Sequence, residues 1–264
     1  IPLSLHDALP ISQGWNDGCW VGMAHNKNER DYAYNAFLGF KQIDPNINFS
    51  FREVKDTNGA YSGFGSSVVS RLLDILFNKG ARNKKIPEFF WDAKKECVLG
   101  LLEGYICGDG CNLITKSGSG SETEKISVSS CNKKLLYQVR KLLLRFNIVG
   151  SINIHNKEPK KIKINKYIIT SGISYSLSVR GKKASILSEL LFGKSLLPIN
   201  NKARESSHYY ISNGYLYLRI EDIKEIDTVK EVYGYQVNQN NSFCVVGFAT
   251  HNTKVINEIG RAHV

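Results

Sequence analysis

The chain has 264 residues, of which 42% are hydrophobic, and this is enough for one large core or two modest ones. Its formal charge is +11, from 35 lysines and arginines against 24 aspartates and glutamates, and such a surplus favours a polyanionic partner such as nucleic acid. No run of 18 apolar residues predicts a membrane-spanning helix, and the six cysteines are too sparse for a disulfide scaffold. We therefore expect an intracellular, cytoplasmic protein with no membrane partner.

The two ends of the chain have an unusual composition. The first residues, IPLSLHDALPIS, contain two prolines, a histidine and an aspartate and lack a basic region, so they do not predict a signal peptide. They resemble translated sequencing adapters, as does the terminal EIGRAHV. We expect residues 1–12 and the tail within 253–264 to be non-native, and the natural chain to continue past both ends.

A first structural unit is predicted at 13–91. CWVGM (19–23) is a strand candidate and ERDYAYNAFLGF (29–40) is a helix candidate. Two further strands, INFSFREV (47–54) and AYSGFGS (60–66), precede a helix at 67–80.

A second unit is predicted at 92–204 and begins with a helix that ends at Asp109. Strands NLITK (112–116) and KISVS (125–129), a helix at 132–147, strands near 151–168 and 173–180, and a helix at 182–192 follow. The tripeptide D-G-C occurs in both units, at Asp17–Cys19 and at Asp109–Cys111. The sequence therefore predicts an α+β fold made of two αββαββα repeats, the first truncated at its first helix.

Glycines at 100, 104 and 108 recur every four residues in the helix that ends at Asp109. Each interior glycine costs a helix about 1 kcal/mol relative to alanine, and the helix dipole disfavours an anion at the C-terminal end. Glycines on one face allow another backbone to approach closely. We therefore expect two such helices to pack together and to bring Asp17 and Asp109 to one place.

Several strands alternate apolar residues with polar or basic ones, as in KIKIN and INFSFR. One reading is an ordinary antiparallel sheet with one solvated face. With the basic net charge, the pattern also predicts a surface that lies along a DNA groove. The residues of that surface are Asn48, Ser50, Arg52, Lys161, Lys163, Asn165, Ser176, Ser178 and Arg180.

The segment LEGYICGDG (102–110) resembles the nine-residue signature of LAGLIDADG homing endonucleases. KKIPEFFWDAKKE (84–96) resembles the lysine-isoleucine-proline block before the second signature of intein-borne members, and GWNDG resembles the end of a first signature helix. The resemblance implies two signature helices at a pseudo-twofold axis and a saddle of strands on double-stranded DNA. It also implies a monomer and a metal-dependent endodeoxyribonuclease.

Phosphodiester hydrolysis is helped by divalent cations, and Mg²⁺ prefers oxygen ligands such as converging carboxylates. The resemblance makes Asp17 and Asp109 the expected catalytic metal ligands, with Mg²⁺ or another divalent cation as cofactor. Lys84 matches the active-site lysine of the lysine-isoleucine-proline block.

Residues 231–253 resemble the last two sequence blocks of an intein, so 205–252 is expected to be a β-rich C-terminal part of a Hint splicing domain. Asn252 would cyclise, His251 would act as its general acid, and Thr253 would be the nucleophile that begins the downstream extein. Gly234 and Asn241 depart from the residues common at those positions. No N-terminal splicing block is present, so the missing N-terminal intein half is an expected partner.

Three alternatives stay open. A DNA-binding protein of the same fold that does not cleave is the main one, and an RNA maturase is the second. The acidic residues at 17 and 109 favour a nuclease, whereas the intein-like tail disfavours a maturase. The third is a basic α+β domain in which the motifs are accidental.

Overall fold

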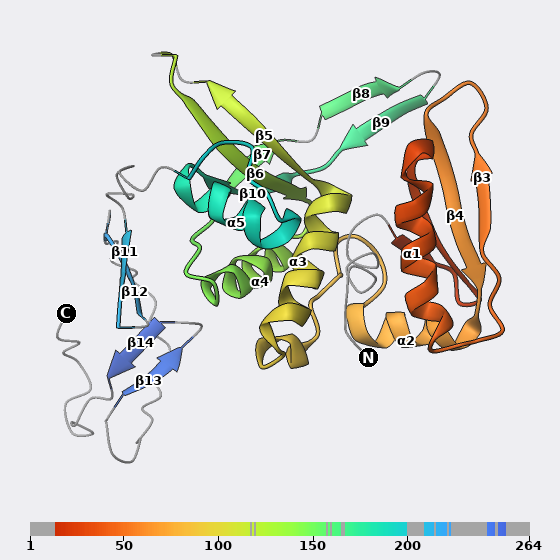
Figure 1. The fold of residues 1–264 in the computed structure, drawn as a ribbon, viewed down its shortest axis with the longest axis horizontal. Helices are drawn as coiled ribbons and strands as arrows, with labels where there is room; N and C mark the ends of the chain where they lie inside the picture. The colour runs from red at the N-terminus through yellow and green to blue at the C-terminus, as the bar shows by residue number, and fades with distance from the viewer. Residues whose placement is uncertain are drawn as a thin grey trace. The chain divides into compact units, whose positions relative to one another are not determined.

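The protein is described from a computed structural model (Figure 1). The structure describes the backbone alone for residues 156, 160, 162–164, 167–171, 242–245 and 248–251. The structure describes residues 14–116, 118, 120–156, 158, 160–164, 167–199, 209–213, 215–220, 222, 242–245 and 248–251. The chain divides into two units, 1–207 and 208–264.

The first repeat is an antiparallel sheet covered by two helices. Its sheet has the order β1-β2-β4-β3. The rings of Phe37 and Phe40 in α1 lie 5.8 and 5.4 Å from the ring of Phe64 in β4, which joins α1 to the sheet. Ser66 caps α2 by accepting a hydrogen bond from the Val69 amide. The elements are β1 (Gly14–Asn16), β2 (Trp20–Asn26), the 3₁₀ helix η2 (Lys27–Glu29), α1 (Arg30–Lys41), β3 (Ser50–Glu53), β4 (Gly59–Gly65) and α2 (Ser67–Phe77).

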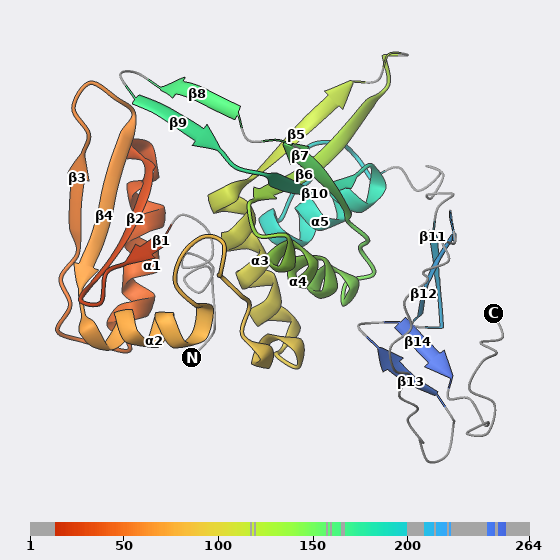
Figure 2. The same ribbon diagram turned by 180° about the vertical axis from the view of Figure 1, so that it is seen from behind.

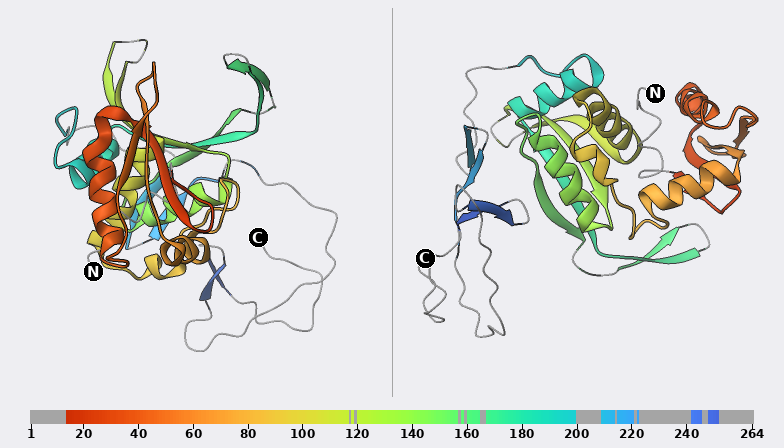
Figure 3. Two further views of the ribbon diagram at one scale, coloured as in Figure 1. Left: turned by 90° about the vertical axis from the view of Figure 1, so that its right-hand side faces the viewer. Right: turned by 90° about the horizontal axis from the view of Figure 1, so that it is seen from below.

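The second repeat follows a short linking segment and has a second antiparallel sheet, in the order β5-β6-β10-β7. Helices α3, α4 and α5 pack against it, as Figure 3 shows. The elements are η3 (Glu88–Trp91), α3 (Lys95–Asp109), β5 (Gly110–Lys116), β6 (Glu122–Ser130), α4 (Lys133–Leu144), β7 (Ser151–Asn156), β8 (Lys160–Ile164), β9 (Tyr167–Ser171), β10 (Ser174–Arg180) and α5 (Lys182–Phe192).

The two sheets have the same topology. In each, the first and second strands form a hairpin, and the fourth strand lies between the second and the third. This agreement supports the predicted duplication and confirms a mixed α/β fold with antiparallel sheets. One apolar core runs through both repeats, and it includes Ile86 and Phe90 of the linking segment.

Two local predictions are wrong. Residues 14–16 form a strand paired with β2, where the end of a signature helix was expected. Residues 151–168 do not form one strand, because the chain leaves the sheet after β7 and forms the separate β8–β9 ribbon before it returns as β10. Figure 2 shows this ribbon standing apart from the four-stranded sheet. The residues between SINIHN and KIKIN include Pro159, and a proline argues against one continuous strand, so the sequence held a signal that the prediction overlooked.

The second unit contains two described hairpins. β11 (Tyr209–Ser212) pairs with β12 (Tyr215–Leu218), and β13 (Ser242–Val245) pairs with β14 (Phe248–His251). The β13–β14 pair agrees with the strand pair predicted before the His-Asn dipeptide. Within the described part of the chain, no helix is long and apolar enough to cross a membrane.

Candidate functional site

Asp109 is the last residue of α3, and the chain turns there directly into the first strand of the sheet. The turn requires glycine at position 110, because a Cβ atom would lie 2.5 Å from the Ile106 carbonyl oxygen and 2.8 Å from Cγ1 of Val128. The Asp-Gly pair therefore has a local cause: aspartate ends the helix and glycine lets the backbone pass between helix and sheet.

Lys84 comes from the linking segment before α3. Its ammonium group and the carboxylate of Asp109 influence each other through their opposite charges. Its Nζ donates a hydrogen bond to the Gly14 carbonyl oxygen at 3.2 Å. Burial lowers the pKa of Lys84, and the charge of Asp109 acts in the opposite direction. Burial raises the pKa of Asp109 to about 6, although the Lys84 ammonium group partly offsets this rise. The structure thus brings together two of the three residues predicted for nuclease chemistry.

Tyr105 lies one helical turn before Asp109 and is a site residue that sequence reasoning missed. Its side chain is only 1% exposed, and burial, followed by the charge of Asp109, raises the pKa of its hydroxyl group. The spacing of four residues on a helix was the signal that could have paired it with Asp109. Cys131 is exposed and is close enough to Lys84 to act on the pKa of its ammonium group.

Asp17 occupies a different place from Asp109. It lies in the hairpin turn after β1, whereas Asp109 precedes β5, the strand equivalent to β1. Its Oδ1 accepts hydrogen bonds from the amides of Cys19 at 3.3 Å and Trp20 at 2.8 Å, and these lower its pKa. No hydrogen bond or electrostatic interaction joins Asp17 to Asp109 among the described residues. The equivalence inferred from the repeated tripeptide is therefore not seen, and the metal-binding role of Asp17 stays a prediction.

The predicted DNA-facing residues of the first repeat are all accessible. Asn48, Ser50 and Arg52 are exposed, while Ile47 between the helices and the sheet is buried. Asn48 lies just before β3, and the other two are in β3. The alternation predicted from INFSFR is thus present in the structure.

In the second repeat the predicted residues belong to a wider polar face. Strand register places Ser176 opposite Ser129 and Asn153, and Ser178 opposite Ser127 and Ser151. Ser176 is half-buried and Arg180 is exposed, but Ser178 is only 9% exposed and offers little surface to a ligand. Sequence reasoning missed the partners on β6 and β7, although KISVS and SINIHN alternate in the same way. The missed residues are Lys125, Ser127, Ser129, Ser151 and Asn153.

The remaining predicted residues are placed only in part. Lys161 and Lys163 both belong to β8, in the separate β8–β9 ribbon, and Lys161 is exposed. His251 is the last residue of β14. Asn165, Asn252 and Thr253 lie outside the described residues.

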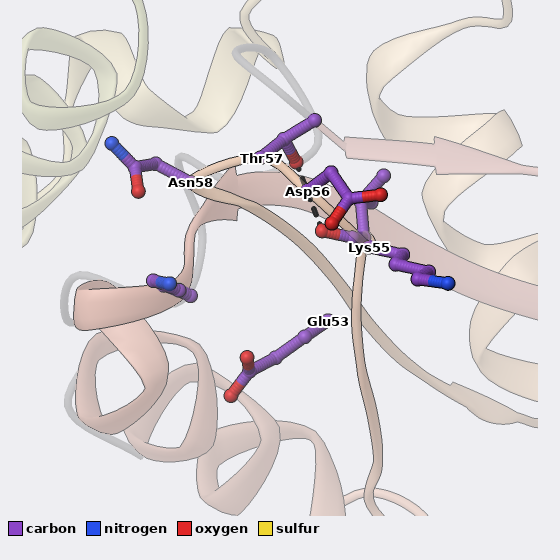
Figure 4. A pocket seen from close by; sticks show the side chains of 7 residues that line it. Glu53, Lys55, Asp56, Thr57 and Asn58 are labelled. Carbon is purple, nitrogen blue, oxygen red and sulfur yellow. Dashed lines mark hydrogen bonds between the residues drawn. The ribbon is translucent and has the colours of Figure 1, made fainter.

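Two cavities are notable among the described residues of the first repeat and the segment that follows it. One, of about 490 Å³, surrounds the β3–β4 turn, where Figure 4 shows the side chains of Glu53 and Lys55 pointing in different directions. Its polar groups do not converge, and Thr57 already donates its hydroxyl to the Val54 carbonyl oxygen at 3.1 Å. The other, of about 400 Å³, is mainly apolar and is bordered by Lys84. Neither has the donor set of a catalytic centre.

A divalent cation fits the Asp109 site only in part. In the described ranges no cluster of three or more histidine, cysteine, aspartate or glutamate side chains could hold a metal ion. Mg²⁺ does not need such a cluster, because it is commonly held by one or two carboxylates together with substrate phosphates. Asp109 supplies one carboxylate, and DNA would supply the phosphate oxygens.

Comparison with known proteins shows where the chain has relatives. Residues 96–182 match the family described as LAGLIDADG-like domain. The chain is 31% identical over 180 residues to the ATP-dependent DNA helicase Hel308 of Thermococcus kodakarensis, which covers 67% of this chain and 15% of the helicase. It is 28% identical over 218 residues to a probable translation initiation factor IF-2 of Methanocaldococcus jannaschii. That match covers 78% of this chain and 17% of the factor. The chain thus spans less than a fifth of the length of these relatives.

Among solved structures, the fold is similar to that of I-DmoI, a homing endonuclease, in complex with DNA and Ca. The TM-score is 0.51 over 76% of this chain and 96% of that chain, with 9% sequence identity. The chain therefore contains a LAGLIDADG-like domain at 96–182 and has a fold like that of the homing endonuclease I-DmoI.

Proposed function

We propose that the chain is a metal-dependent endonuclease that cleaves double-stranded DNA at specific sites. The observation that carries the proposal is the position of Asp109 at the junction of α3 and β5, the first strand of a sheet with a polar face, where the charge of Lys84 also acts on it. A half-buried carboxylate influenced by a half-buried ammonium group is a costly arrangement, and such groups gather at functional sites.

Each group has a distinct role in this proposal. The ionised Asp109 carboxylate would hold Mg²⁺, which would supply water activation and neutralisation of charge on the leaving oxygen. Lys84 places a positive charge beside the phosphate, where negative charge increases during hydrolysis. The polar faces of the two sheets contact the groove and the phosphates, with Arg52 and Arg180 as exposed cations, and the β8–β9 ribbon adds the exposed Lys161.

The test begins with a DNA duplex that the full chain selects from a randomised pool. Cleavage of that duplex should require Mg²⁺ and stop with EDTA, and Asp109→Asn should bind DNA without cleaving it. Binding with no cleavage under any divalent cation would reject the nuclease and leave the non-cleaving DNA-binding protein as the function. Selection of RNA instead of DNA would favour a maturase.

We also propose that the chain is the C-terminal portion of an intein. The chain matches small parts of a helicase and an initiation factor, whose named activities are unrelated, and a mobile element inserted into different hosts explains such matches. The β13–β14 hairpin, which ends at His251, supports the proposal because the predicted cleavage point follows it directly.

This second proposal is tested with a complementary N-terminal intein half. The peptide that begins at Thr253 should be released, with a succinimide at Asn252, because the side-chain amide of that asparagine attacks its own carbonyl carbon. Thr253→Ala should block ligation but spare cleavage. Mass spectrometry of the products decides, and release that persists in Asn252→Ala would mean ordinary proteolysis.

A further inference from the structure

The linking segment 84–93 lies along helix α4, and three side chains of that helix or its caps hold the backbone of the segment. Asn132 donates from Nδ2 to the Lys84 carbonyl oxygen at 2.6 Å. Gln138 accepts from the Ile86 amide at 3.0 Å and donates to the Ile86 carbonyl oxygen at 3.4 Å. Arg145 donates to the carbonyl oxygens of Phe90 at 3.1 Å and Ala93 at 2.7 Å. Side chains of α4 and its caps thus satisfy several backbone groups of a segment that has no regular structure at its start.

Asn132 has two functions that can be separated. Its Oδ1 caps α4 by accepting a hydrogen bond from the Leu135 amide at 3.1 Å, while its Nδ2 holds Lys84. The residue is 7% exposed, so both bonds are largely shielded from water. Most helix caps require only the acceptor, and the additional donor is what ties Lys84 to the helix.

The same turn joins Lys84 to the end of β6. Ser130, the last residue of β6, accepts a hydrogen bond from the Asn132 amide at 3.0 Å. On the other side of Lys84, Lys85 donates its amide to the Phe77 carbonyl oxygen at 2.9 Å, and Ile86 is 1% exposed in the core. The backbone around Lys84 is therefore fixed by α4, by α2 and by the core.

We infer that Asn132 and Gln138 are positioning residues for Lys84, whose backbone they hold against α4 at the end of β6. The inference rests on the proposed function, because it gives Lys84 its role at the phosphate. Displacement of a catalytic group by about 1 Å can cost about 100-fold in rate, so a clamp on the backbone of Lys84 has a direct effect on cleavage.

Three variants separate this role from general stability. Asn132→Ser keeps a good helix cap but is too short to reach the Lys84 carbonyl oxygen. Gln138→Met keeps the length of the side chain and removes both bonds to Ile86. Arg145→Met is the matched control, because it removes two bonds from the same helix to the same segment at the end far from Lys84 in sequence.

The first measurement is the reactivity of Lys84 toward an acylating reagent at fixed pH, in the absence of metal and DNA. Mass spectrometry quantifies the labelling, and the exposed Lys85 is the internal reference. In Asn132→Ser and Gln138→Met the ratio of Lys84 to Lys85 labelling should rise about fivefold, as expected when a local opening loses one net hydrogen bond. Arg145→Met should leave the ratio unchanged. An unchanged ratio in the first two variants, or an equal rise in the control, would overturn the inference.

The second measurement is single-turnover cleavage of the selected duplex. Asn132→Ser should lower the rate by about 10- to 100-fold with unchanged DNA affinity, whereas Arg145→Met should cleave at the wild-type rate. Equal rates in Asn132→Ser and wild type would show that the clamp does not serve catalysis. If the wild-type chain does not cleave at all, the proposed function fails, while the labelling ratio still decides whether α4 positions Lys84.

Discussion

The two repeats share one sheet topology but place the same tripeptide in different surroundings. In the second repeat, Asp109 ends a helix before the first strand and faces Lys84. In the first repeat, Asp17 lies after the first strand, and its carboxylate accepts hydrogen bonds from the backbone amides of Cys19 and Trp20. The chain that precedes Gly14 lies outside the described residues. The comparison shows that a repeated Asp-Gly-Cys does not by itself identify equivalent positions, because Asp-Gly also suits hairpin turns.

The electrostatics of the two aspartates differ in direction. Asp17 is fully exposed, and backbone amides lower its pKa. Burial raises the pKa of Asp109 to about 6, so its ionised form is held at a cost. A carboxylate that is destabilised as an anion gains more from a bound cation than one already satisfied by amides. We therefore expect Asp109 to be the stronger metal ligand of the two.

The largest expected difference between the repeats is in catalysis. Asp109→Asn should reduce Mg²⁺-dependent cleavage by about 100-fold or more, because it removes the charge that holds the cation. Asp17→Asn should reduce the rate less, because backbone amides already satisfy its carboxylate. The measurement is single-turnover cleavage of the selected duplex at saturating protein.

The control for this pair is DNA affinity, which should be unchanged in both variants. An equal loss of cleavage in Asp17→Asn would contradict the comparison and would favour the original prediction of two equivalent metal ligands.

A second difference should appear in the pH dependence of folding. At pH 8 without metal, Asp109→Asn should be more stable than wild type by about 1–3 kcal/mol, because one pKa unit corresponds to about 1.4 kcal/mol. The folded-state pKa lies above the unfolded value, so the wild type loses stability as pH rises from about 4 to about 6, and the advantage of the variant disappears below that range. Urea unfolding at pH 4, 6 and 8 measures this.

Asp17→Asn is the matched variant and should behave in the opposite sense. Because the folded-state pKa of Asp17 is lowered, its contribution is present above the unfolded value and is lost as pH falls below it. The effect should be small, since the group is fully exposed. A pH-independent difference for Asp109→Asn would mean that its carboxyl group titrates normally.

The smallest expected difference concerns the DNA contacts of the two repeats. Replacing Lys161 and Lys163 with alanine should reduce the salt slope of DNA binding by up to about two, since each phosphate contact contributes about 0.9. Arg52→Ala in the first repeat should reduce it by about one. Titrations at several salt concentrations measure both slopes, and unchanged slopes would place the DNA on another surface.

Much of the fold could be predicted from local patterns. The helices α1, α2, α4 and α5 and the strands β4, β6 and β10 agree with the periodicities read from the chain, because each buries residues of one face in a common core. The strand β3 also lies where it was predicted. The β8–β9 ribbon could not be predicted in this way, since its alternation is the same as that of a strand within the sheet. Tyr105 and the clamp residue Asn132 were missed because their roles arise from contacts between distant segments.

The sequence by itself determined the helix that ends at Asp109, the glycine that must follow it, and the lysine-isoleucine-proline block that contains Lys84, because these depend on residues adjacent in the chain. Only the tertiary structure decided that Asp109 faces Lys84, that Asp17 lies in a hairpin turn, and that Asn132 and Gln138 hold the lysine segment on α4. The physical reason is that burial, charge pairing and hydrogen bonds across about 50 residues of sequence depend on how elements pack, which no local periodicity encodes.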